Sequence, residues 1–134
     1  MFRLVLTLCC LALSAVNSTR FTAEQAFSCT IQKNWQFSLV FWEEDSWTPN
    51  EILHQSGTIN VQNIMVYNLV SIFNYDEGDG KMDLSYEIFM TVYHNCTSNG
   101  AHVSKQYFLG HVGIHNKEKL FEAWTQRYNL DNKY

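Results

Sequence analysis

The chain has 134 residues, with 9 Lys and Arg against 13 Asp and Glu, and a formal net charge of −4 at pH 7. This acidic balance argues against nucleic acid and anionic membranes as main partners, because both repel a negatively charged surface. The length suits one domain with a sizeable hydrophobic core. Proline occurs once, and no linker, charge block or internal repeat divides the chain.

The first 18 residues predict a secretory signal peptide. Arg3 precedes an apolar run from Leu4 to Ala15, and the small residues that follow favour cleavage after Ser18. A run of about 12 apolar residues is short for a bilayer span. No later stretch is long and apolar enough, so we expect no membrane span. The predicted organisation is a signal peptide at 1–18 and one domain at 19–134, secreted to the extracellular space.

Two of the four cysteines, Cys9 and Cys10, lie in the predicted signal peptide, which leaves Cys29 and Cys96. An even number of cysteines in an oxidising compartment predicts a disulfide, and two cysteines allow only one connectivity. The closed loop would contribute about 4 kcal/mol in the chain-entropy model. The alternative is a pair of buried free thiols.

Alternation of apolar and polar residues predicts β-strands at 34–42, 65–73 and 86–96; a short segment at 26–32 and the segment 105–115 are further candidate strands. In two of these segments the alternation puts one set of residues on a single face: Trp35, Phe37, Leu39 and Phe41 in the first, and Ile88, Met90, Val92 and His94 in the other. The segment 65–73 alternates less cleanly, which is typical of a strand covered on both faces.

Between these segments the sequence indicates turns and short helices. Glycines and aspartates favour a turn at 74–83. Pro49 at a first helical position favours a helix at 48–55, and 116–124 is a second helical candidate. Short strands separated by turns predict a β-sandwich.

Three blocks carry a family resemblance: FWEEDSWTPNEIL (41–53), TVYHNC (91–96) and YNLD (128–131). In this order they resemble the secreted nematode transthyretin-like family. The resemblance implies an all-β fold, a transthyretin-like or immunoglobulin-like antiparallel β-sandwich of about seven strands with one or two short helices. It also implies an extracellular protein.

The adjacent residues His94, Asn95 and Cys96 have the residue types of a cysteine-protease triad. On a strand, however, His94 and Cys96 share one face and Asn95 points to the other, so the three cannot form the required relay. We therefore predict no catalytic residue. Asn95-Cys96-Thr97 is also a sequon for N-glycosylation. Asn95 is a candidate glycosylation site; the alternative is an unmodified polar residue.

Two clusters invite a metal hypothesis. His94, His102, His111 and His115 lie in the last third of the chain. His111 and His115 would be about 13 Å apart along a strand, which is too far for one ion. The run from Glu43 to Asp45 points in several directions and predicts a solvated loop rather than a calcium site. We expect no metal and no cofactor.

The sequence therefore favours a secreted, non-enzymatic binding protein of the transthyretin-like family. Its expected partner is an extracellular protein or a small apolar ligand, with Trp47 as a possible contact residue. The chain would be a monomer or a small homo-oligomer. One alternative is an oligomeric small-molecule carrier analogous to transthyretin. A hydroxyisourate-hydrolase-type enzyme fits less well, because only Arg20 and Arg127 remain after cleavage to supply arginine.

Overall fold

The computed structural model describes residues 19–44, 49–75, 85–113, 118–121 and 127–132. These residues form nine strands and no helix. The strands are β1 (Thr19–Ser28), β2 (Asn34–Glu44), β3 (Glu51–Gln55), β4 (Ile59–Gln62), β5 (Val66–Tyr75), β6 (Ser85–His94), β7 (Val103–Gly113), β8 (Glu118–Phe121) and β9 (Arg127–Asn129).

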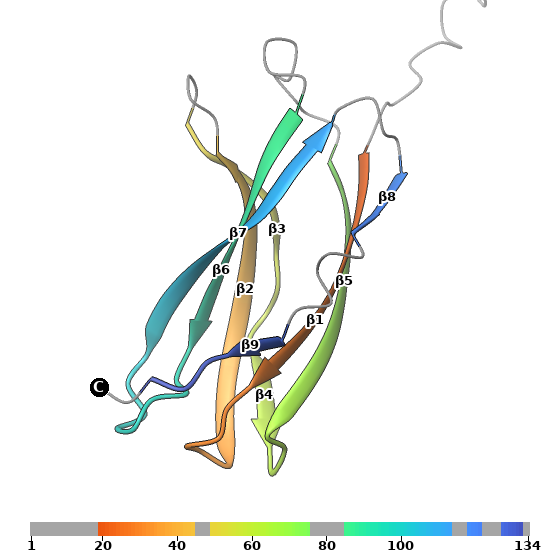
Figure 1. The fold of residues 1–134 in the computed structure, drawn as a ribbon. Helices are drawn as coiled ribbons and strands as arrows, with labels where there is room; N and C mark the ends of the chain where they lie inside the picture. The colour runs from red at the N-terminus through yellow and green to blue at the C-terminus, as the bar shows by residue number, and fades with distance from the viewer. Residues whose placement is uncertain (1–18, 45–48, 76–84, 114–117, 122–126, 133–134) are drawn as a thin grey trace, which may run out of the picture.

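The strands form two facing sheets (Figure 1). One sheet has four strands in the order β5-β1-β8, with β9 also on β1; the other has five in the order β3-β2-β6-β7, with β4 also on β2. The all-β, two-sheet prediction is confirmed, but β8 and β9 pair with β1 in parallel, so the four-stranded sheet is mixed. Strand β8 follows β7 in the chain but lies in the other sheet, beside β1. Because no hairpin connects β8 to β1, their pairing need not be antiparallel.

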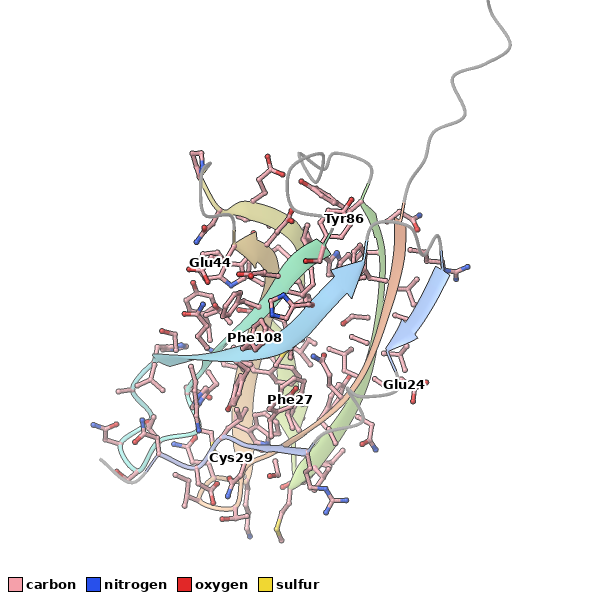
Figure 2. All side chains as sticks on the ribbon, turned by 45° about the horizontal axis from the view of Figure 1, so that its top comes forward. Glu24, Phe27, Cys29, Glu44, Tyr86 and Phe108 are labelled. Atoms are coloured by element: carbon pink, nitrogen blue, oxygen red, sulfur yellow. A yellow bond between two sulfur atoms is a disulfide. The ribbon has the colours of Figure 1, made fainter. Side chains whose placement is uncertain are left out.

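The alternating faces predicted for β2 and β6 are confirmed. Phe37 and Phe41 of β2 are buried, as are Ile88 and Met90 of β6. Aromatic rings fill the space between the sheets: Phe27 of β1 lies 4.8 Å from Phe37, measured between ring centroids (Figure 2). Such ring pairs add about 0.5–1.5 kcal/mol to the burial of their area.

In the described part of the chain no third layer covers the outer face of either sheet. The segment 65–73 is a strand as predicted, but the expectation that it is covered on both faces was wrong. Alternate residues of β5, Ser71 and Phe73, are buried, but Val70 and Ile72 are exposed. Among the described strands, β5 lies at the edge of its sheet and pairs with β1 alone. Its outward residues are apolar although nothing in the described part of the chain covers them.

Both predicted helices are wrong. Most of 48–55 is β3, and the described part of 116–124 is β8. Strand β3 pairs with β2 and buries Leu53. A helix of two turns is only marginally stable on its own. The backbone hydrogen bonds between β3 and β2 and the burial of Leu53 therefore outweigh the local preference of this segment for a helix. The turn predicted at 74–83 lies mostly outside the described residues. No helix among the described residues is long and apolar enough to cross a membrane.

The position of each phenylalanine relative to the two sheets predicts its contribution to stability. Phe37 is 1% exposed, and Phe108 is 53% exposed on the outer face of β7. We expect Phe37→Ala to lower the free energy of unfolding by about 3–5 kcal/mol. Phe108→Ala should lower it by about 1 kcal/mol at most. Urea unfolding of both variants would measure this, and equal losses would contradict the layer assignment.

Candidate functional site

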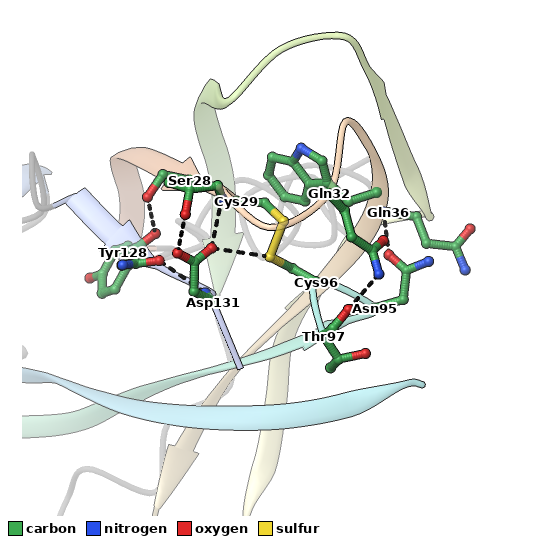
Figure 3. The surroundings of a disulfide bond; sticks show 12 residues. Ser28, Cys29, Gln32, Gln36, Asn95, Cys96, Thr97, Tyr128 and Asp131 are labelled. Carbon is green, nitrogen blue, oxygen red and sulfur yellow. Dashed lines mark hydrogen bonds between the residues drawn. A yellow bond between two sulfur atoms is a disulfide. The ribbon is translucent and has the colours of Figure 1, made fainter. Parts of the chain in front are cut away.

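A disulfide joins Cys29 to Cys96, with their α-carbons 5.8 Å apart (Figure 3). Cys29 directly follows β1 and Cys96 follows β6, so the bond connects the two sheets at one end. Both cysteines are fully buried. The pairing predicted from the cysteine count is therefore present in the structure.

The C-terminal segment closes the same corner. Leu130 donates its backbone N–H to Ser28, and Asn132 donates to Cys96, at 2.9 and 3.1 Å. Asp131 accepts hydrogen bonds from the backbone N–H and the hydroxyl of Thr30. Burial alone raises the pKa of Asp131, but the hydrogen bonds with Thr30, Ile31 and Asn129 together lower it by more, and the net pKa is below its usual value. Asp131 therefore holds the segment as a carboxylate.

This corner has the residue types of a metal or thiol site but cannot act as one while the disulfide is intact. Cys29, Cys96 and Asp131 have their potential ligand atoms within 4.8 Å of one another. The two sulfurs are bonded to each other, so neither is a thiolate that could bind a metal or attack a substrate. The 3.5 Å approach of the Cys96 sulfur to Asp131 is a contact and not a hydrogen bond, because a disulfide sulfur carries no hydrogen.

His94 is only 2% exposed on the inward face of β6. Buried polar atoms usually have a hydrogen-bond partner, yet the Nδ1 of His94 has none among the described residues. Burial, and secondarily the charge of Lys105, lowers its pKa. His94 is thus held neutral inside the sandwich.

The other described histidines have separate local partners. His54 stacks on Phe73, with ring centroids 5.2 Å apart. His102 lies 3.1 Å from the amide nitrogen of Gln36, and His111 lies 3.5 Å from a carboxylate oxygen of Glu87. His115 lies outside the described residues.

Asn95 extends the pairing of β2 with β6. Its side-chain oxygen accepts from the backbone N–H of Gln36 at 2.8 Å, and its own N–H donates to the Gln36 carbonyl at 3.2 Å. The side chain is half-buried and makes no other hydrogen bond in the described part of the chain. Glycosylation at Asn95 remains a prediction.

An aromatic row crosses the outer face of the five-stranded sheet. It consists of one residue from each of four neighbouring strands, in cross-strand register: Ile52, Trp42, Phe89 and Phe108. Ile52 is 62% exposed and Phe108 53% exposed. The rings of Phe89 and Phe108 lie 5.0 Å apart, and the indole of Trp42 donates to the hydroxyl of Thr91 at 3.1 Å. The row is therefore ordered as well as exposed.

A β-bulge sets the end of this row. The pairing of β6 with β7 shifts between Ile88 and Phe89, and Gly110 at the bulge has φ of 134°. Only glycine adopts this backbone conformation readily. The extra residue brings Phe108 and His111 onto one face, with their rings 5.3 Å apart. Without the bulge the two residues would point to opposite faces.

An acidic row runs beside the aromatic row. Glu44 of β2 and Glu87 of β6 are cross-strand partners, and His111 is the partner of Glu87 on β7. The predicted acidic loop is therefore wrong for two of its three residues: Glu43 and Glu44 end β2, and Glu43 is buried. Asp45 lies outside the described residues.

The predicted contact residue Trp47 also lies outside the described residues. Trp42 is the tryptophan on the described outer face. The sequence contained the signal for it, because a strand that buries Phe37, Leu39 and Phe41 must point Trp42 outward.

Residues 24–126 match the model of the family described as Caenorhabditis elegans protein of unknown function (DUF870). No curated protein and no solved structure matches the chain.

The disulfide should account for a large share of the stability. We expect the double variant Cys29→Ser, Cys96→Ser to lose about 4 kcal/mol of unfolding free energy, because the unfolded chain regains the entropy of a long loop. Urea unfolding would measure the loss. In the wild-type protein, denatured without reductant, Cys29 and Cys96 should take up no iodoacetamide. Labelling of both cysteines would contradict the bond.

His94 should make stability depend on pH. Its folded-state pKa is lowered, so the unfolded chain binds more protons near and below about pH 6.5. Stability should therefore be complete above that pH and fall as the pH is lowered through it towards the folded pKa. His94→Asn should flatten this dependence, and His102→Asn, at an exposed position, should not. Urea unfolding at pH 7.5 and 5 would measure the difference, and an unchanged slope in His94→Asn would contradict it.

Proposed function

The chain belongs to the DUF870 family, and we propose that it is a secreted, non-enzymatic protein that recognises a basic protein surface outside the cell. The observation that carries the proposal is the exposed aromatic row beside paired carboxylates on the outer face of the five-stranded sheet. The proposal includes kinship with the transthyretin-like family. The blocks at 41–53 and 91–96 support that kinship, and a two-sheet, all-β fold is consistent with it.

The aromatic row has the composition of a binding surface. Aromatic side chains supply large contact areas at a low cost in conformational entropy, and they dominate the energy of many protein interfaces. Trp42 and Phe89, in the middle of the row, are half-buried. Ile52 and Phe108, at its two ends, are exposed and accessible to a partner. A partner that covered it would remove apolar area from water at about 25 cal/mol per Å².

The acidic row indicates the charge of the partner. Glu44 and Glu87 are directly opposite on neighbouring strands, and like charges in this position repel each other. A lysine or arginine from a partner would relieve that repulsion and pair with both carboxylates. Complementary charge of this kind also speeds association. The outer face therefore suits a partner with an apolar centre flanked by basic groups.

Three observations support a secreted protein without catalysis. The first 18 residues have the pattern of a signal peptide, and the Cys29–Cys96 disulfide is typical of oxidising compartments. The bonded cysteines provide no thiolate nucleophile. His94, the histidine nearest to them in the sequence, is buried between the sheets and is a poor candidate for contact with a substrate.

The described surface offers weaker support for a small apolar ligand. A hollow of about 240 Å³ lies over β1 and β5, lined by Glu24, Gln25, Ala26, Asn68, Leu69 and Val70. Pockets for drug-sized ligands have volumes of about 300–1,000 Å³ and enclose most of the ligand. Half of the residues that line this hollow are polar or charged. Protein recognition therefore fits the described surface better.

Two exposed residues of similar accessibility allow a matched test. Phe108 is 53% exposed on the five-stranded sheet, and Ile72 is 51% exposed on the four-stranded sheet. The secreted protein would be screened by biolayer interferometry against purified extracellular domains, half of them basic and half acidic. We expect binders among the basic domains. Phe108→Ser should weaken binding at least about tenfold, which is the loss of one well-packed contact, and Ile72→Ser should leave it unchanged.

Other outcomes of this screen would contradict the proposal. These are equal binding of acidic and basic domains, or an equal effect of the two substitutions. Native mass spectrometry of the same sample tests the carrier alternative, because a dimer or tetramer with retained non-covalent mass would favour a small-molecule carrier.

A further inference from the structure

The outer face of the five-stranded sheet ends in a polar hollow of about 180 Å³. Five side-chain amides line it, from β2, from β4 and from the residue after β6: Asn34, Gln36, Asn60, Gln62 and Asn95. Trp35 and Val61, both buried, complete the lining. None of the described residues that line the hollow is charged. Its volume is below the range for drug-sized ligands, which suits a single ring with polar substituents.

Most of these amides are unpaired. The side chains of Asn34, Asn60 and Gln62 make no hydrogen bond among the described residues. Asn34 is the cross-strand partner of Gln62, and Gln36 is the partner of Asn60, so the register holds the amides together. Each carboxamide offers two donors and an acceptor without charge. This set matches a ligand with neutral groups that donate and accept, such as sugar hydroxyls and an acetamide.

Asn95 occupies the wall of this hollow and begins the sequon Asn95-Cys96-Thr97. Its oxygen accepts from the Gln36 backbone, and its Nδ2 has no partner in the described part of the chain. N-glycosylation replaces one hydrogen of Nδ2 and leaves the oxygen as an acceptor. The pairing of Asn95 with β2 can therefore persist in a glycosylated protein.

We infer that Asn95 carries an N-linked glycan and that its first sugar, an N-acetylglucosamine, lies in the amide-lined hollow. The inference rests on the proposed secretion. In the transfer step, the bond from Nδ2 to the sugar C1 forms as the bond from C1 to the diphosphate of a lipid-linked oligosaccharide donor breaks. The lipid diphosphate leaves with the bonding electron pair, and one Nδ2 hydrogen leaves as a proton.

The burial of the sequon beside the Cys29–Cys96 disulfide determines at which stage of folding the glycan is transferred. Thr97, the third residue of the sequon, is buried, and its hydroxyl lies 3.0 Å from the carbonyl of Ala101. Cys96 is buried in the disulfide. A transferase cannot reach this tripeptide in the folded protein, so transfer precedes closure of the corner. Cys29→Ser, which prevents the disulfide, should therefore raise the fraction of chains glycosylated at Asn95.

The first experiment is intact and peptide mass spectrometry of the full-length chain expressed in eukaryotic cells, with medium and cells analysed separately. We expect a glycan at Asn95 that peptide N-glycosidase removes and that Asn95→Gln abolishes. A protein that reaches the medium without a glycan would overturn this inference and leave the proposed secretion intact. A glycosylated protein that stays inside the cell would count against secretion and not against the site.

The second experiment tests whether the sugar lies in the hollow. Glycan removal should lower the melting temperature of the wild type by about 2–4 °C. In Asn60→Ala, which removes one amide from the hollow, the same removal should have a smaller effect. Gln106→Ala, an exposed substitution on β7 outside the hollow, should preserve the wild-type difference. Equal effects in all three proteins would overturn the placement of the sugar.

Discussion

The Cys29–Cys96 disulfide is the constraint on which the rest of the structure depends, because it joins the end of β1 in one sheet to the end of β6 in the other. The core between the sheets is made largely by contacts between residues far apart in the sequence, such as Phe21 with Tyr86, and contacts of that kind require costly loop closures. The covalent bond closes a long loop, with a sequence separation of 67, beside the strands it connects. The C-terminal segment then binds to both ends of that bond, through the Leu130 N–H to Ser28 and the Asn132 N–H to Cys96.

With the sheets fixed in this way, register decides what the outer face presents. The inward residues of β2 and β6 make the core, and the residues between them are left to form the aromatic and acidic rows. Gly110 adjusts this pattern at β7, because the bulge keeps both Phe108 and His111 on the outer face. A shift of one residue would bury these side chains and expose the core set. The proposed recognition surface and the core therefore depend on the same register.

The parts of this arrangement that follow from local pattern could be predicted from the sequence, and the others could not. Alternation in β2 and β6 places Phe37 and Met90 inside, and the cysteine count predicts the disulfide. Strand β4 has four residues and one buried side chain, Val61, which is too short a signal for periodicity. The helix predicted at 48–55 fails because its cap signals are local, whereas its pairing with β2 is not. The amide hollow joins β2, β4 and Asn95, and no sequence spacing indicates that these residues meet.

The outer face also has a direction, because its chemistry changes along β2. Gln36, beside Asn95, begins the amide end, and Trp42 lies six residues further along the strand, about 20 Å away at 3.3 Å per residue. A partner in an interface of ordinary size covers about 800 Å² per side, a patch about 30 Å across. The proposed glycan and the aromatic row are thus far enough apart for the row to remain uncovered, and close enough for one partner to contact both. The glycan would then limit the partner's orientation by closing the amide end of the face and leaving the acidic end open to basic groups.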